Sequence, residues 1–215
     1  MRLPILFHPT TVVLVDDSDS FLKSLTFQLD PLLPGKTFHD TAVALDWFAR
    51  STRREDLPLH VDFDSLSQSP DQPNVAVDMR RIHRVCEQPM RFTIPSVLVV
   101  DYSMPAMDGL QALGELVDWP GSRVLLTGQA DEQVAVRAFN RGLIDQFIAK
   151  QTEKLASHLA ATIQMLMARP NARFHQIWAA TLTPRQSAIL RDPRVADDLA
   201  RFAASTFVEW FVIGD

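Results

Sequence analysis

The sequence contains one cysteine, Cys86, in 215 residues. One cysteine cannot build a framework of intrachain disulfides or a cysteine-ligated metal cluster. No apolar run approaches the roughly 18 residues that a membrane-spanning helix requires. The N-terminal MRLPILFHP lacks the long apolar segment and small-residue cleavage site of a secretory signal. These absences predict a cytoplasmic protein that does not enter a membrane.

Positive charge is also scarce, because 21 Lys and Arg stand against 26 Asp and Glu, for a net charge of -5. A chain with this balance has no large basic field for a nucleic-acid backbone, which argues against nucleic acid as a partner. The sequence also lacks a glycine-rich loop ending in Gly-Lys-Ser/Thr and a Gly-x-Ser-x-Gly elbow. Nucleotide-binding and serine-esterase functions of those kinds are therefore disfavoured.

Apolar runs that end at a polar residue recur along the chain. Such runs are typical of strands buried on both faces of a parallel sheet. A weaker run covers residues 36–39. The four stronger ones are Thr11 to Val15 before Asp16 and Asp17, Ser96 to Val100 before Asp101, Arg123 to Leu126 before Thr127, and Gln146 to Ala149 before Lys150.

Helical patterns separate these runs, at residues 20–29, 41–50, 109–117 and 131–141, the last ending at Gly142. Strands that alternate with helices predict a doubly wound parallel sheet covered on both faces. In such sheets the residues that end the strands gather in one crevice. A single acidic residue after a strand is usually a helix cap or turn residue, so the prediction of a functional site depends on the recurrence.

Two segments lie outside this alternation. Residues 51–95 are rich in proline and polar residues, so we interpret them as an insertion with a possible helix from Val75 to Cys86. Residues 152–168 form an amphipathic helix, and 169–173 interrupt it. Further helices are predicted at 174–180, after Thr183, and from Pro193 to about Trp210.

Four segments resemble the receiver domain of two-component response regulators: VVLVDDSDS, VLVVDYSMPAMDGL, RVLLTG and FIAK. The resemblance covers residues 10–168 apart from the insertion, and it leaves residues 169–215 as a helical C-terminal extension. It implies a five-stranded, doubly wound parallel sheet of the flavodoxin-like order. The extension either packs on the receiver or a second copy, or leads to a further domain.

The resemblance also assigns roles to the residues that end the strands. Asp101 would accept a phosphoryl group from a sensor histidine kinase or a phosphotransfer protein. Three clustered carboxylates repel one another unless a hard cation lies between them, and Mg²⁺ suits that position. The ligands would be Asp16, Asp17, Asp101 and the backbone carbonyl of Ser103.

Three more residues would act on the phosphoryl group or respond to it. Lys150 would pair with one phosphoryl oxygen, and the Thr127 hydroxyl would donate to another. Thr127 and Phe147 would form the switch that transmits the signal; an ordinary core phenylalanine is the alternative for Phe147. Ser103 stands where phosphatases with an aspartyl intermediate commonly carry a general acid, which favours a switch with self-phosphorylation and autodephosphorylation over a classical enzyme.

Two features depart from the family pattern. The insertion places Asp101 84 positions after Asp17, about twice the usual receiver spacing. Gln151 follows Lys150 where most receivers have proline, which favours a trans peptide bond.

The sequence after Lys150 gives two indications about the output of the switch. LTPRQSAIL at residues 182–190 resembles the opening of a LuxR-type helix-turn-helix, but the region after Lys150 holds seven Lys and Arg against six Asp and Glu. We expect instead that the apolar stripe of the last helix is buried in a homodimer or by a downstream domain. The alternative functions are a receiver-like adaptor that signals without phosphate and, less favoured, a transcription regulator that acts through the C-terminal helices.

Overall fold

The computed structural model describes residues 6–7, 10–29, 35–51, 59–61, 75–77, 80, 87, 92–128, 132–167 and 182–212. The chain divides into two compact units. One, here called the sheet unit, comprises Thr10–Arg53 and Phe92–Arg169. The other, the terminal unit, comprises Met1–Pro9, Arg54–Arg91 and Pro170–Asp215.

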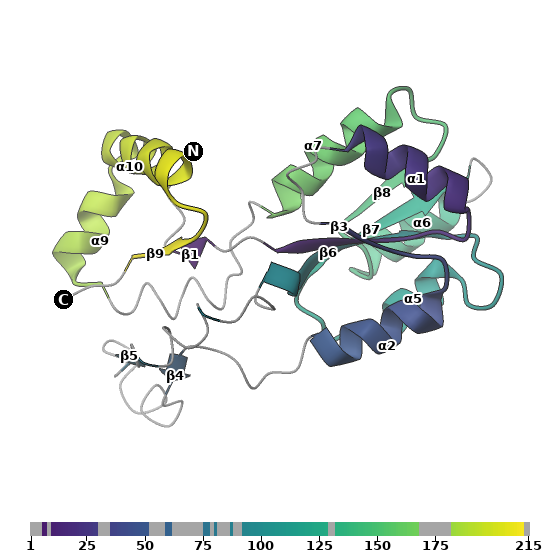
Figure 1. The fold of residues 1–215 in the computed structure, drawn as a ribbon, viewed down its shortest axis with the longest axis horizontal. Helices are drawn as coiled ribbons and strands as arrows, with labels where there is room; N and C mark the ends of the chain where they lie inside the picture. The colour runs from purple at the N-terminus through teal and green to yellow at the C-terminus, as the bar shows by residue number, and fades with distance from the viewer. Residues whose placement is uncertain are drawn as a thin grey trace. The chain divides into compact units, whose positions relative to one another are not determined.

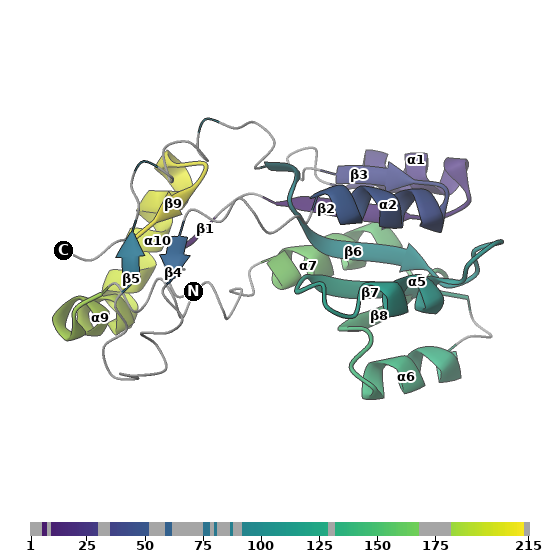
Figure 2. The same cartoon turned by 90° about the horizontal axis from the view of Figure 1, so that it is seen from below.

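The sheet unit is built on five parallel strands in the order β3-β2-β6-β7-β8. Figure 2 shows them side by side in this order. The chain runs from β2 outward to β3 and then returns to add β6 on the other side of β2, which puts a topological switch point between β2 and β6. This order confirms the predicted flavodoxin-like sheet. The strands are β2 (Thr11–Val15), β3 (Gly35–Phe38), β6 (Pro95–Asp101), β7 (Ser122–Thr127) and β8 (Gln146–Ala149).

Helices cover both faces of the sheet, with α1 and α7 on one face and α2 and α5 on the other (Figure 1). Alternate residues of each strand point to opposite faces, so Val12 and Leu14 enter one core cluster while Val13 and Val15 enter the other. The helices are α1 (Asp19–Gln28), α2 (Thr41–Ser51), α5 (Gly109–Glu115), α6 (Glu132–Asn140) and α7 (Leu155–Met167).

Local sequence signals set the ends of these helices. Ser18 caps α1, and Asp108 forms a capping box with Gln111 at the start of α5. Gly142 follows α6 with φ 69°, a conformation that costs glycine little, which confirms it as the predicted C-terminal cap.

Among its described residues, the terminal unit has short strands and two helices. β1 (Leu6–Phe7) pairs with β9 (Trp210–Phe211), and β4 (Leu59–Val61) pairs with β5 (Val75–Val77), both antiparallel. The helices α9 (Pro184–Arg191) and α10 (Pro193–Thr206) begin after Thr183 and Asp192, as their sequence signals predict. No helix among the residues that the structure describes has the length and apolarity needed to cross a membrane.

Two sequence predictions about this unit are wrong. Val75 begins a strand instead of a helix, because its β-branched run pairs with β4. The last helix ends at Thr206, since Phe207 is extended, and Trp210 belongs to β9. The predicted helix at 174–180 and most of the insertion lie outside the described residues.

Candidate functional site

Three charged side chains meet at the carboxyl edge of the sheet. Asp16 follows β2, Asp101 ends β6, and Lys150 follows β8. The Lys150 Nζ atom lies 2.7 Å from Oδ2 of Asp16 and 2.9 Å from Oδ2 of Asp101. Both carboxylates are buried, so the lysine supplies the compensating charge that buried anions need.

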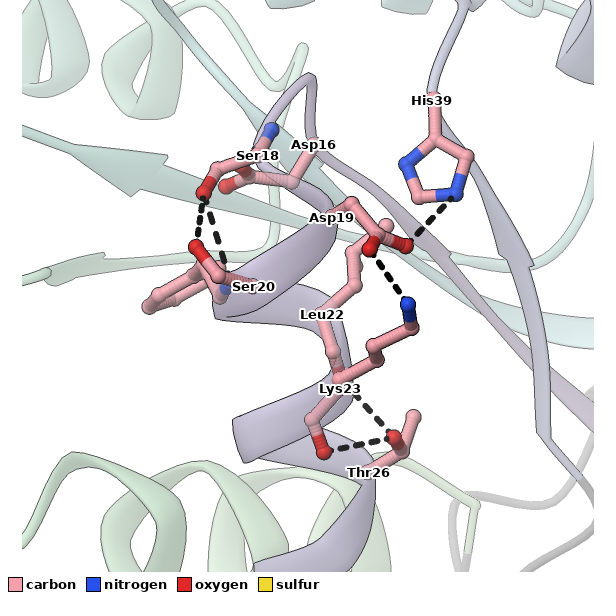
Figure 3. A network of polar contacts seen from close by, with 9 residues as sticks. Asp16, Ser18, Asp19, Ser20, Leu22, Lys23, Thr26 and His39 are labelled. Carbon is pink, nitrogen blue, oxygen red and sulfur yellow. Dashed lines mark hydrogen bonds and ion pairs between the residues drawn. The ribbon is translucent and has the colours of Figure 1, made fainter.

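The turn between β2 and α1 fixes the orientation of Asp16 (Figure 3). The Ser18 backbone N–H donates to Oδ1 of Asp16 at 2.9 Å, and the Ser18 hydroxyl accepts from the Phe21 backbone N–H at 3.3 Å. One oxygen of Asp16 is thus held by the turn while the other faces Lys150.

Asp19, on the exposed side of the same turn, contacts Lys23 at 2.5 Å and His39 at 3.5 Å (Figure 3). The contact with Lys23, reinforced by the charges of Lys23 and His39, lowers the pKa of Asp19. This pair of contacts connects the start of α1 to the end of β3.

Asp17 completes an acidic cluster. One carboxylate oxygen each from Asp16, Asp17 and Asp101 lie within 4.8 Å of one another, and Asp17 is the exposed member. Oxygen atoms of carboxylates, together with an open side for water, are the ligands that Mg²⁺ prefers. This donor set fits the cation that the resemblance implies.

Burial and neighbouring charges shift two pKa values at the site. Burial raises the pKa of Asp101, assisted by the Asp16 charge and opposed by Lys150 and the Ser103 backbone N–H. Burial alone would lower the pKa of Lys150, but contact with Asp16 and Asp101 outweighs it and raises that pKa above its usual value. Lys150 therefore remains charged at neutral pH.

Thr127 ends β7 beside these groups. Its side chain is fully buried, and its hydroxyl has no hydrogen-bond partner within the described part of the chain. An unsatisfied buried hydroxyl typically costs about 1–3 kcal/mol, so Thr127 keeps a donor available for an incoming oxygen. Its backbone carbonyl accepts from the Lys150 N–H at 2.9 Å.

Two other predicted residues lie nearby. Ser103 is exposed, and its backbone N–H donates to the Asp101 carboxylate. Phe147 lies on β8, partly buried against the core cluster under α2, α5 and α6. The peptide bond between Lys150 and Gln151 is trans, as the sequence favours.

Sequence reasoning missed the part that Gly109 plays. A Cβ atom there would lie 2.3 Å from the Asp101 carbonyl oxygen, so only glycine allows α5 to start against the end of β6. The Gly109 N–H donates to the Tyr102 carbonyl at 3.0 Å. The only signal in the sequence is a glycine after the helix cap Asp108, and that does not reveal the approach to Asp101.

A family comparison agrees with this geometry: residues 67–162 match the model of the response regulator receiver domain. The chain contains a response regulator receiver domain. Receiver domains of this family act in phosphorylation-dependent signalling, in general terms. The match starts inside the insertion and leaves out β2 with Asp16 and Asp17, which the structure nonetheless places next to β6.

Solved structures support the same fold. The response regulator LqsR of Legionella pneumophila is 30% identical with a TM-score of 0.73, and the alignment covers 99% of this chain and 62% of that one. The present chain therefore spans about 62% of the LqsR chain. A second solved structure is the signal receiver domain of a putative Luxo repressor protein from Vibrio parahaemolyticus, which is 17% identical with a TM-score of 0.52. The alignment covers 79% of this chain and 97% of that one, and this likeness shows the fold alone. A search of curated protein sequences found no match.

Proposed function

We propose that this receiver is a phosphorylation-controlled switch in which Asp101 accepts a phosphoryl group from a sensor histidine kinase or a phosphotransfer protein. Mg²⁺ would be held by Asp16, Asp17, Asp101 and the Ser103 backbone carbonyl. The observation that carries the proposal is the contact of 2.9 Å between Lys150 and the buried carboxylate of Asp101, at the edge where the acidic cluster lies. The protein would act in the cytoplasm.

The transfer needs a nucleophile and a set of groups that stabilise negative charge. An Asp101 oxygen attacks phosphorus, a P–O bond forms, and the P–N bond to the donor histidine breaks. The electron pair of the broken P–N bond stays on the imidazole, which takes up a proton as it leaves. Bound Mg²⁺ would neutralise charge on the carboxylates and the phosphoryl oxygens.

Two residues of the chain then bind the product. Lys150 already lies beside Asp101 and would pair with a phosphoryl oxygen as a point charge. The Thr127 hydroxyl, which lacks a partner in the described residues, would donate to another. Movement of Thr127 would change the burial of Phe147, so that a local electrostatic event alters the packing of the domain surface.

The output would be a change in partner or dimer contacts. On α10 the alanines Ala196, Ala200 and Ala203 are buried, whereas Leu199 and Phe202 on the same helix are 38% and 58% exposed. Phe207 and Val208 extend the exposed apolar surface beyond the helix. A surface of this kind supports burial against a second copy of the chain.

Incubation with acetyl phosphate and Mg²⁺, followed by intact mass measurement, tests the transfer. The expected result is a gain of one phosphoryl group that is lost in Asp101→Asn. Asp118→Asn is the matched control, because Asp118 is exposed and outside the cluster, and it should gain the group like the wild type. No gain at any Mg²⁺ concentration would favour the phosphate-independent adaptor.

A further inference from the structure

Phe21, in the first turn of α1, faces the ammonium group of Lys150. The Nζ atom of Lys150 lies 4.8 Å from the centroid of the Phe21 ring. This distance is within the range in which a cation is attracted to the face of an aromatic ring. We infer that Phe21 is a positioning residue that holds Lys150 toward Asp101, an inference that rests on the proposed phosphoryl transfer.

The ring is fixed by the same turn that orients Asp16. The Phe21 backbone N–H donates to the Ser18 hydroxyl, the Ser18 N–H donates to Asp16, and Asp16 contacts Lys150. The contact between ring and ammonium closes this circuit of four residues. Phe21 also packs against the core cluster under α1 and α7. Its ring therefore has little freedom to move away from Lys150.

The contact with Phe21 matters because the other two partners of Lys150, Asp16 and Asp101, would also bind the cation or carry the phosphoryl group. Mg²⁺ would engage the carboxylates of Asp16 and Asp101, and phosphorylation would convert Asp101 to an acyl phosphate. A lysine has a flexible four-carbon stem, and the Lys150 side chain is 26% exposed to water. Neither the cation nor the phosphoryl group would bind the Phe21 ring. The ring would therefore keep the ammonium group of Lys150 beside Asp101 during the transfer.

The first test is the rate at which acetyl phosphate modifies Asp101, at fixed pH and Mg²⁺. Phe21→Leu keeps an apolar side chain but removes the ring, and should lower the rate about two- to fivefold, the range that an exposed cation–π contact typically gives. Phe21→Tyr keeps the ring and should stay close to wild type. Phe27→Leu changes a phenylalanine of the same helix that is 91% exposed, and should have no effect.

A second measurement does not depend on phosphorylation. Acylation of lysines by acetic anhydride, followed by peptide mass analysis, reports how well each amine is shielded, with the exposed Lys154 as internal reference. Lys150 should react faster in Phe21→Leu than in the wild type, and at the wild-type rate in Phe21→Tyr. Phe21→Met, which also lacks a ring, should behave like Phe21→Leu and provides a second variant if the leucine variant folds poorly.

The two measurements separate the possible failures. Equal Lys150 labelling and equal phosphorylation rates in Phe21→Leu and the wild type would overturn the inference. Equal losses in Phe21→Leu and Phe21→Tyr would overturn it too, because they would indicate core packing and not the ring face. A wild type that is never phosphorylated would contradict the proposed function, while the labelling would still judge the contact between Phe21 and Lys150.

Discussion

The ammonium group of Lys150 lies 2.9 Å from the carboxylate of Asp101, although their strands are not neighbours in the sheet. β7 runs between β6 and β8, so this ion pair crosses the end of β7. The same ammonium contacts Asp16 after β2. One lysine therefore compensates two buried carboxylates from two strands, and it links the chemistry of the site to the stability of the fold.

Replacing Lys150 with methionine should destabilise the protein. Removing one partner of a buried ion pair typically costs about 3–5 kcal/mol, and we expect about 2–3 kcal/mol because Lys150 is 26% exposed. Urea unfolding at neutral pH measures the change. Lys154→Met, at an exposed lysine, should change the free energy of unfolding by less than about 0.5 kcal/mol. Equal stabilities of the wild type and Lys150→Met would contradict this account of the ion pair.

The raised pKa of Lys150 predicts a dependence of stability on alkaline pH. A pKa that is higher in the folded protein than the ordinary 10.5 means that the folded state holds its proton more tightly. This contribution is complete below pH 10.5 and is lost as the pH rises through the folded-state pKa. From about pH 10 to about pH 12, where lysines titrate, the free energy of unfolding should fall more steeply for the wild type than for Lys150→Met. Parallel curves for the two proteins would contradict this prediction.

Asp17→Asn should weaken Mg²⁺ binding about tenfold or more, because outer-shell partners alone typically cost 10- to 100-fold and Asp17 would be a direct ligand. Titration calorimetry gives the affinities. Asp118→Asn, which changes the same net charge at an exposed position outside the cluster, should bind like the wild type. Identical affinities in the two variants would rule out a shared site at Asp16, Asp17 and Asp101.

Gly109→Ala should destabilise the protein by about 1–3 kcal/mol, the usual cost of overpacking, because its Cβ would lie 2.3 Å from the Asp101 carbonyl oxygen. Gly114→Ala is the control in the same helix, since no atom lies within 4 Å of its added Cβ. That change should stabilise α5 by about 0.5–1 kcal/mol. Thermal unfolding of both variants decides the point, and a neutral Gly109→Ala would mean that α5 can shift away from β6.

The exposed apolar surface of α10 predicts a homodimer. Sedimentation of the full chain at high micromolar concentration should give a dimer, and Phe202→Glu should shift it to a monomer by placing a charge among apolar side chains. Phe27→Glu introduces the same charge on α1 and should remain dimeric. A monomeric wild type would refute the dimer.

The sequence predicted four of the five strands of the sheet well because each of them is a compact signal, whereas β3 was the weaker candidate. β8 was predicted at its observed bounds, and β6 and β7 within one residue at each end, since apolar runs buried on both faces stop at the site residues. β1 and β9 have two residues each, and they depend on pairing between opposite ends of the chain. No local sequence pattern predicts strands of this kind.

The candidate site was also predictable from the sequence only in part. Asp16, Asp101, Thr127 and Lys150 could be grouped from sequence because parallel strands end at one edge. The second contact of Lys150, with Asp16, and its approach to Phe21 depend on side-chain directions that strand periodicity does not specify.

The central claim is that Asp101 carries the phosphoryl group, and chemical localisation tests it most directly. Borohydride reduces an acyl phosphate to an alcohol, which converts a phosphorylated aspartate to homoserine that peptide sequencing by mass spectrometry can place. After treatment with acetyl phosphate and Mg²⁺, the account predicts homoserine at position 101 and at no other aspartate. Homoserine at another position, or none after a confirmed gain of phosphate, would contradict it.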